Sequence, residues 1–233
     1  MRENKKGCDL KSCFLCRQCL PEWLPAINAN KKTFHFNKGE LIFKEGDEVK
    51  GMYFIFHGTV KVHKKWGEEK ELILRFAKNG EIIGHRGLGD EIVYPVSGTA
   101  LESTTVCYIA LDFFKSTLKV NNDFTIKLLM FYAEELQRSE RKMNNLAHMQ
   151  VKGRIATSLL SLKNKFGVTA SGDIDVILSR QDLASYSGTT YETVFRILNE
   201  LTLENIISTR NKNIAIINEI KLEHLTKEGG QLN

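Results

Sequence analysis

The chain has 233 residues, 42% of them hydrophobic, and a formal net charge of +5 at pH 7. This length and composition exclude a disordered chain and indicate a globular protein with room for a regulatory domain and a small second domain. No apolar run is long enough to span a membrane and the N-terminus lacks a signal-peptide core, so we expect a cytoplasmic protein.

Residues 1–21 form a basic leader that holds four of the five cysteines. These four are Cys8, Cys13, Cys16 and Cys19, and the fifth is Cys107. An odd number of cysteines crowded near one end is a poor disulfide framework, and in a reducing compartment such a cluster more often binds metal or does redox chemistry. The C-x2-C-x2-C spacing that begins at Cys13 matches three thiolates of a ferredoxin-type iron–sulfur cluster. Zinc binding, a thiol switch and the absence of a cofactor are the alternatives.

Residues 22–122 predict a β-domain. Alternating apolar residues indicate strands at 34–36, 41–43, 52–56, 59–62, 72–76 and 105–109. Glycines at positions 39, 46, 58, 67, 80 and 84 separate these segments at turns. Many short strands with regular turns are typical of a sandwich or a barrel-like roll.

Residues 123–150 predict one long helix without Pro or Gly. Its apolar side chains follow an a/d-like seam that comprises Ile126, Leu129, Ala133, Leu136, Met143 and Ala147. In the same frame Glu140 occupies a core position between Leu136 and Met143. A helix of this length extends beyond one small roll, so we expect the seam to pair with a second copy of the chain. The alternative is that the seam packs on its own β-domain.

Residues 178–201 predict a helix-turn-helix. Ser179 is a good N-cap with Asp182 as its capping-box partner, Gly188 suits a tight turn, and Thr190 caps the second helix. The inward face of that helix carries Val194, Ile197, Leu198 and Leu201, and the outward face carries Tyr191, Glu192, Phe195, Arg196 and Asn199. A recognition helix presents such residues to base edges, where arginine suits guanine and glutamate accepts from cytosine N4. The alternative is an ordinary helical hairpin with a surface Glu192–Arg196 pair.

Two short strands at 206–209 and 214–217 surround residues 210–213 and predict the wing of a winged helix. From Val151 onward the chain has ten Lys/Arg and nine Asp/Glu, so DNA affinity would depend on a few placed cations. The candidates are Lys152, Arg154, Arg180, Arg210 and Lys212. At the wing tip, Arg210 and Lys212 are placed for phosphate.

A roll, a long helix and a winged helix in this order resemble the Crp/Fnr family of bacterial transcription regulators. The motifs that carry the resemblance are Lys38-Gly39-Glu40, Gly46-Asp47 and Gly58-Thr59-Val60 in the roll and Glu192-Thr193-Val194-Phe195-Arg196 in the recognition helix. The resemblance implies an α+β fold with a cyclic-nucleotide-binding-like jelly roll at 22–122, a dimerisation helix at 123–150 and a winged helix-turn-helix at 151–233. It also implies a homodimer that binds near-palindromic double-stranded DNA, reads bases with Glu192 and Arg196, and controls transcription initiation with RNA polymerase. Tyr191 and Phe195 depart from the residues that relatives often carry.

The resemblance offers two kinds of effector. Cyclic-nucleotide binders of the family use a Gly-Glu-Leu stretch followed by an Arg-Ser pair, where this chain has Gly84-His85-Arg86-Gly87-Leu88 and then Tyr94-Pro95. Tyr94 stands where the phosphate-binding arginine would be, and Pro95 has no backbone N–H to donate to the phosphate. The sequence therefore argues against binding of a cyclic nucleotide. The family's oxygen sensor holds an iron–sulfur cluster with N-terminal cysteines and one distal cysteine. Residues 100–107 look like its distal segment, which implies Cys107 as the fourth ligand with Cys13, Cys16 and Cys19.

The implied signal is oxygen, redox state or nitric oxide. The leader departs from the oxygen sensor, whose last two N-terminal cysteines are farther apart, and Cys8 is a surplus thiol or an alternative ligand. One rival is a relative without a cluster that responds to a small ligand in the roll. The other rival is a cupin-like metalloenzyme, but no His-x-His pair occurs between residues 30 and 110, so we do not expect an enzyme.

Overall fold

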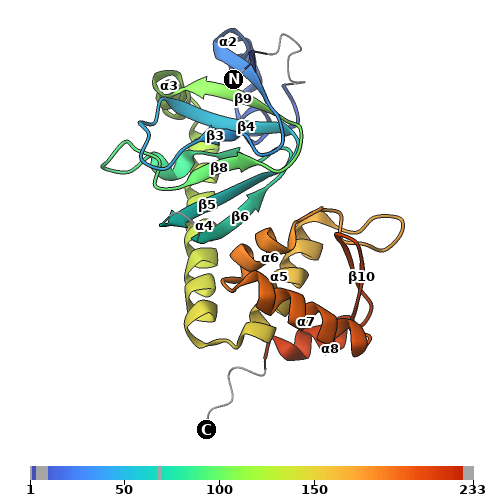
Figure 1. Cartoon of the computed structure of the whole chain (residues 1–233). Coiled ribbons are helices and arrows are strands. Elements are labelled where there is room, and N and C mark those ends of the chain that lie inside the picture. Colours follow the sequence, from blue (N-terminus) through green and yellow to red (C-terminus); the bar gives the residue numbers. More distant parts are fainter. Residues whose placement is uncertain (1, 4–9, 68–69, 228–233) are drawn as a thin grey trace. The chain divides into compact units, whose positions relative to one another are not determined.

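The computed structural model describes residues 2–3, 10–67 and 70–227, so Cys8 lies outside the described residues (Figure 1). The chain divides into two compact units, Met1–Leu136 and Gln137–Asn233, which we describe separately. No helix in the described ranges is both long enough and apolar enough to cross a membrane.

The first unit is a roll of two antiparallel sheets. One sheet has the order β1-β2-β9-β4-β7 and the other has the order β3-β8-β5-β6. The strands are β1 (Arg2–Glu3), β2 (Lys31–Phe36), β3 (Leu41–Phe43), β4 (Gly51–His57), β5 (Val60–Trp66), β6 (Lys70–Ala77), β7 (Ile82–Ile83), β8 (Ser97–Ala100) and β9 (Thr104–Ala110). Side chains from both sheets meet in one core, in which Phe54 of β4 and Val60 of β5 are fully buried.

Short helices and 3-10 turns complete the first unit and add side chains to its core. They are α1 (Phe14–Gln18), the 3-10 turn η1 (Pro21–Trp23), α2 (Leu24–Asn30), the 3-10 turn η2 (His85–Gly87) and α3 (Leu111–Val120). The prediction of β-structure across 22–122 is therefore wrong at α2 and α3. In α2 the proline at position 25 suits the first turn of a helix. In α3 Leu111, Phe114 and Leu118 follow helical rather than alternating spacing.

All six strands expected in the roll are present, but the sequence did not predict β1, β7 and β8. The β8 segment Ser-Gly-Thr-Ala has small side chains and no apolar alternation, and its central place between β3 and β5 makes it a strand. Gly98 in β8 is required by packing, since a Cβ there would lie 2.5 Å from the Phe43 ring. Tertiary neighbours thus override a weak local preference.

The long helix α4 (Asn122–His148) begins in the first unit and continues into the second. On one face Phe124 and Leu128 pack into the core of the roll. The predicted seam lies on exposed positions, with Leu129 66% exposed in the single chain. The alternative that the seam packs on its own β-domain is therefore wrong.

The second unit is a winged helix. Its elements are α5 (Val151–Phe166), α6 (Arg180–Ser187), α7 (Tyr191–Leu203), the antiparallel pair β10 (Ile207–Arg210) and β11 (Asn213–Ile216), and α8 (Glu219–Leu225). The wing strands agree with the prediction to within one residue, whereas α8 was not predicted. The core joins Leu159 of α5, Leu183 of α6 and Leu201 of α7, all buried.

Candidate nucleic-acid interface and sensor region

Local hydrogen bonds build the helix-turn-helix as its sequence predicts. Ser179 Oγ accepts from the Asp182 amide at 3.0 Å, and Asp182 Oδ2 accepts from the Ser179 amide at 3.3 Å. Gly188 ends α6 in the left-handed region, with φ 65°. Thr190 then caps α7, because its hydroxyl accepts from the Thr193 amide at 3.3 Å. The capping box, the turn glycine and the second cap are all confirmed.

Burial of one face of α7 decides which residues point outward. The four apolar residues assigned to the inward face, Val194, Ile197, Leu198 and Leu201, are all buried. The five residues assigned to the outward face, Tyr191, Glu192, Phe195, Arg196 and Asn199, are all exposed. The helix therefore presents the predicted reading residues on a single face.

The charged residues of α7 do not pair as the hairpin alternative supposed. Arg196 bonds Glu200, one turn further along the helix, rather than Glu192. This pair is exposed and contributes little stability, so the guanidinium can exchange it for another acceptor at small cost. A backbone hydrogen bond and the Thr190 hydroxyl lower the pKa of Glu192. Its carboxylate is therefore an acceptor at neutral pH, as an ordinary glutamate is.

Two of the wing-side cations already have protein partners. Arg210 Nη2 lies 3.2 and 3.1 Å from the two carboxylate oxygens of the buried Asp173. Arg180 Nη2 donates to the Asn211 carbonyl at 2.9 Å and so ties α6 to the wing turn. Lys212 is exposed in that turn. Of these cations, Lys212 fits the expected phosphate contact best.

Lys152 and Arg154, expected as phosphate contacts, are used inside the second unit. Lys152 Nζ pairs with Glu204 at 2.9 Å. The Arg154 guanidinium donates to three carbonyl oxygens, those of Ser187 at 3.0 Å, Gly188 at 3.1 Å and Met149 at 2.9 Å. Arg154 therefore braces the turn between α6 and α7, whereas Lys152 ties α5 to the C-terminal end of α7.

Lys142 of α4 braces the same turn. Its Nζ donates to the Tyr186 carbonyl at 2.9 Å and lies 4.2 Å from the centre of the Tyr186 ring. Burial lowers the pKa of Lys142 to about 7. With Arg154, it donates to three consecutive carbonyls at the C-terminal end of α6, those of Tyr186, Ser187 and Gly188. The sequence carried no local signal for this contact, because it joins residues 44 positions apart.

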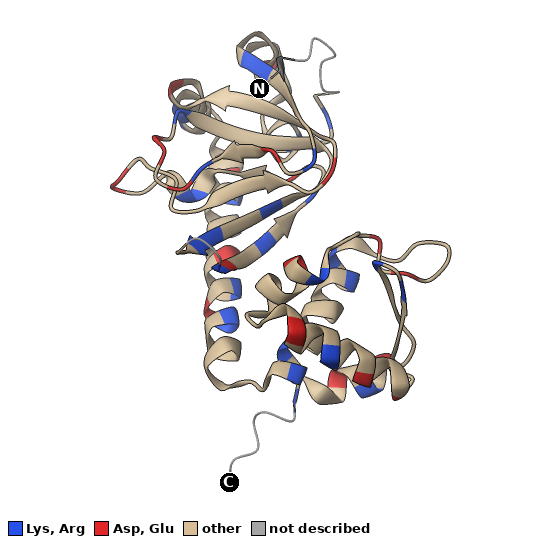
Figure 2. Ribbon diagram, in the orientation of Figure 1, with Lys and Arg blue, Asp and Glu red and all other residues tan. Residues whose placement is uncertain are grey.

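Charge is distributed in the second unit as its composition implies. Lys and Arg alternate with Asp and Glu along α7 and α8, and no broad field of one sign is visible on these ribbons (Figure 2). Affinity for DNA would then depend on a few individual cationic side chains that contact phosphate, rather than on a broad basic surface.

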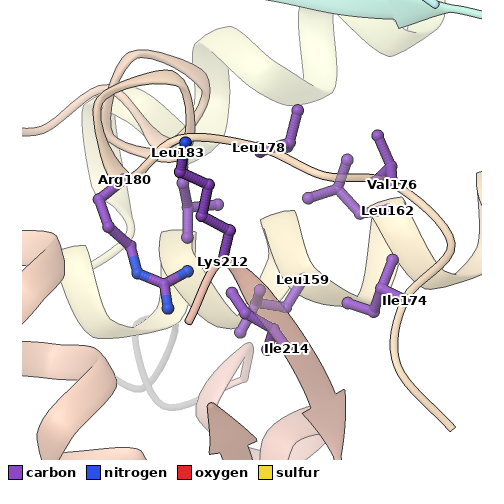
Figure 3. Close-up of a pocket in the computed structure, with 9 residues that line it drawn as sticks. All are labelled: Leu159, Leu162, Ile174, Val176, Leu178, Arg180, Leu183, Lys212 and Ile214. Carbon is purple, nitrogen blue, oxygen red and sulfur yellow. The ribbon is translucent and has the colours of Figure 1, made fainter. Parts of the chain in front are cut away.

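A small hollow lies between α5, α6 and the wing (Figure 3). Its wall is apolar, with Leu159, Leu162, Ile174, Val176, Leu178, Leu183 and Ile214, and Arg180 and Lys212 lie at one side. The hollow has room for about 20 Å³, which is enough for a single water molecule. It is a packing seam of the winged helix and too small for an effector.

The four described cysteines lie in the core of the first unit. Cys13 is the N-cap of α1, Cys16 lies within α1, Cys19 is its C-cap, and Cys107 lies on β9. Each is at most 8% exposed, and all four belong to one cluster of core residues. Burial, with Cys13 nearby, raises the pKa of Cys19 to about 12, so this thiol stays neutral without a metal.

The part of the leader described from residue 10 onward is packed against the roll rather than separate from it. Phe14 donates its amide to the Gly80 carbonyl at 2.7 Å, and its ring contacts Phe124 and Phe131 of α4. The thiols are the donor set that an iron–sulfur cluster prefers. Among residues 10–67 and 70–227, however, no three His, Cys, Asp or Glu side chains are arranged to hold a metal ion.

The segment that replaces the family's nucleotide motif is occupied by internal contacts. Arg86 Nη2 pairs with Glu135 of α4 at 2.9 Å, and Arg75 Nη1 lies 3.6 Å from the same carboxylate. Tyr94 donates its hydroxyl to the Gly51 carbonyl at 2.9 Å. Burial, and then the nearby Arg75, lowers the pKa of His85 to about 3. Of these residues, Arg86 therefore holds the roll to the first half of α4, and Tyr94 is engaged within the roll.

Glu135 was missed by the sequence analysis, although its position carried a signal. It follows Phe124, Leu128 and Phe131 at helical spacing, which places a carboxylate on the buried stripe of α4. Burial alone would raise the pKa of Glu135, but Arg75 and Arg86 outweigh it and lower the pKa to about 2.

Glu135→Gln is expected to lower the free energy of unfolding by about 3 kcal/mol at pH 7, because the partly buried Arg86 loses its carboxylate. Arg75 also loses a carboxylate but keeps that of Glu81. Since the folded pKa lies below the ordinary value, this stabilisation is complete above pH 4.5 and is lost as the pH falls towards 2. Urea unfolding across this range measures it, with the exposed Glu134→Gln as the matched control. Equal unfolding curves for Glu135→Gln and wild type would contradict the proposed role of the pair.

The fold and its outward recognition helix define a DNA-binding transcription regulator, and comparison with known proteins identifies its family. The cyclic nucleotide-binding domain model matches residues 33–121, and the Crp-like helix-turn-helix domain model matches residues 153–225. The cAMP-activated global transcriptional regulator CRP of Salmonella typhimurium is 33% identical over 180 residues, covering 75% of this chain and 84% of the relative. The chain belongs to the Crp/Fnr family, and it is a regulator rather than an enzyme.

A second relative matches more of the chain. The transcriptional activator protein anr of Pseudomonas aeruginosa is 29% identical over 231 residues, covering 95% of this chain and 93% of the relative. Its alignment therefore extends into the cysteine-bearing leader. Among solved structures, FixK2 of Bradyrhizobium japonicum has a TM-score of 0.75 at 24% identity and covers 84% of this chain and 96% of its own. This structural likeness supports the fold assignment.

Proposed function

We propose that this regulator binds near-palindromic double-stranded DNA as a homodimer in the bacterial cytoplasm, where it acts with RNA polymerase. The observation that carries the proposal is the single exposed face of α7, with Glu192 and Arg196 presented by a capped helix. On this proposal Arg196 donates to guanine and Glu192 accepts from cytosine N4. Exposed Lys212 contributes a phosphate contact without base preference.

The dimer is proposed from the exposed seam of α4. Ile126, Leu129, Leu136 and Met143 are each more than half exposed in the single chain. Ala133 and Glu140 lie on the same side and are exposed as well. An apolar stripe of this length on one helix is the surface that a parallel partner helix buries. Two recognition helices, one from each copy, would then read two half-sites.

Arg196→Ala is expected to cost about 1–3 kcal/mol at the preferred site and to relax discrimination at one base pair per half-site. Lys212→Ala should instead weaken preferred and scrambled sites about equally and lower the salt slope by about one. Competition binding at several salt concentrations separates the two effects. The assigned roles are wrong if Arg196→Ala keeps the wild-type ratio between preferred and scrambled DNA.

We further propose that the protein senses oxygen, redox state or nitric oxide through a cluster held by Cys13, Cys16, Cys19 and Cys107. When bound, an iron–sulfur cluster supplies a redox-active, oxygen-sensitive centre. Support comes from the burial of all four thiols in the core of the first unit, three from the leader and the fourth from β9. In the described part of the chain the thiols are not grouped to hold a metal, so binding a cluster requires them to move together. Ligation requires deprotonated thiols, so neutral Cys19 would release its proton as it binds.

A second candidate input is a small polar ligand in the roll, and His85 favours it. Both ring nitrogens of this buried residue lack a hydrogen-bond partner among the described residues. A buried polar group without a partner is costly, and a polar ligand would relieve that cost. Protein that contains neither iron nor zinc, yet loses DNA binding after exhaustive dialysis, would favour this input over the cluster.

A further inference from the structure

The recognition helix exposes two aromatic rings beside its charged reading residues. Tyr191 is 45% exposed and Phe195 is 53% exposed, one helical turn apart. Their ring centroids lie 6.4 Å apart with an interplanar angle of 14°, so the rings are stacked. Stacking limits the rotamers of both side chains and presents one apolar surface on the face that also carries Glu192 and Arg196.

The chemistry of Phe195 restricts what this surface can recognise. A phenyl ring has no hydrogen-bond donor or acceptor, so it discriminates between bases through apolar contact alone. The one apolar group that an unmodified base pair presents in the major groove is the C5-methyl group of thymine, and apolar side chains including Phe contact it. Cytosine carries only a hydrogen at C5, and guanine and adenine have no methyl group there.

We infer that Tyr191 and Phe195 form an apolar reading surface that selects a thymine methyl group beside the base pairs assigned to Glu192 and Arg196. This inference rests on the proposed placement of α7 in the major groove. It adds a preference for A·T pairs at the flank of each half-site. The stacked geometry favours this role over two independent surface residues, because it holds the rings in place before DNA binds.

The test compares methylated and unmethylated pyrimidines in a site selected in vitro by the full-length protein. Each thymine of one half-site is replaced in turn by uracil, which lacks only the methyl group. At one or two flanking positions wild type should lose about three- to fivefold in affinity, the effect of one buried methyl group. When thymine at such a position is instead replaced by cytosine, affinity should also fall. 5-Methylcytosine at the same position should restore part of that loss.

Protein variants assign the effect to the rings. Phe195→Ala should bind thymine and uracil sites equally, whereas Arg196→Ala should keep the methyl dependence while losing its own base preference. This double-mutant cycle isolates the contact between ring and methyl group. Phe195 is exposed, so the variant should fold, and a thermal unfolding curve checks that it does.

Two outcomes overturn the inference. Wild type that binds every uracil-substituted site as tightly as the parent site shows that no methyl group is read. Methyl dependence that persists in both Phe195→Ala and Tyr191→Ala shows that another residue reads it. Either result can occur while Arg196→Ala still changes base discrimination. Failure of the proposed function is therefore distinguishable, since it would also abolish that change.

Discussion

Replacing Cys107 by serine is expected to remove iron and acid-labile sulfide from protein purified without oxygen. Cys107 is the one proposed ligand outside the leader, so its loss leaves a cluster with three thiolates from one short segment. Wild type should contain iron and sulfide in comparable amounts and show broad visible absorbance that bleaches in air. Cys16→Ser should give the same loss, whereas Cys8→Ser should retain the colour.

Cys107 is buried, so a folding defect must be separated from the loss of a ligand. Cys107→Ala preserves a small apolar side chain, and its circular dichroism and thermal unfolding report whether the roll is intact. A folded Cys107→Ala that keeps its iron and sulfide would contradict the ligand assignment. Stoichiometric zinc without sulfide in wild type would replace the cluster by a zinc site.

Leu129→Glu is expected to weaken the dimer about 100-fold or more, because two buried leucines are lost and two carboxylates meet across the seam. Leu129 is 66% exposed in the single chain, so the substitution should leave each monomer folded. Sedimentation gives the dimerisation constant, and DNA titration should show a parallel loss of affinity. Lys127→Glu, at an exposed position of the same helix outside the seam, is the matched control.

Glu140→Leu should have the opposite effect and tighten the dimer. In a parallel pair, Glu140 would face its symmetry mate between Leu136 and Met143, where two carboxylates repel each other and are partly desolvated. In the absence of the signal, this repulsion would keep the dimer weak. A small change elsewhere in the protein could then shift the equilibrium between monomer and dimer. Equal dimerisation constants for wild type and Glu140→Leu would show that Glu140 remains in water.

Local signals predicted the recognition unit well. The capping box at Ser179, the turn at Gly188 and the apolar face of α7 depend on neighbours within a few residues, and all three are present. The partners of the cationic side chains could not be predicted in the same way. Arg154 and Arg210 are charged residues in suitable segments, yet carbonyls of the turn and Asp173 hold them. Those partners lie 33 or more positions away in sequence.

The roll shows the same division between local and tertiary determinants. Strands with apolar alternation were predicted, while β8 forms from small residues because β3 and β5 lie on either side of it. The ion pairs of Glu135 join α4 to η2 and β6, and no local pattern in those segments indicates their partners. The cysteines were located by their spacing, but their common burial in one core was visible only in the folded chain.

Selection of DNA from a random pool by the full-length protein would show whether this chain is a dimeric, sequence-specific regulator. We expect enrichment of a near-palindromic site whose two half-sites lie one helical turn apart, about 34 Å between centres. Each half-site should contain a G·C pair whose identity ceases to matter in Arg196→Ala. Enrichment of a single asymmetric half-site, or of no sequence over the random pool, would contradict the proposal that this chain is a dimeric, sequence-specific regulator.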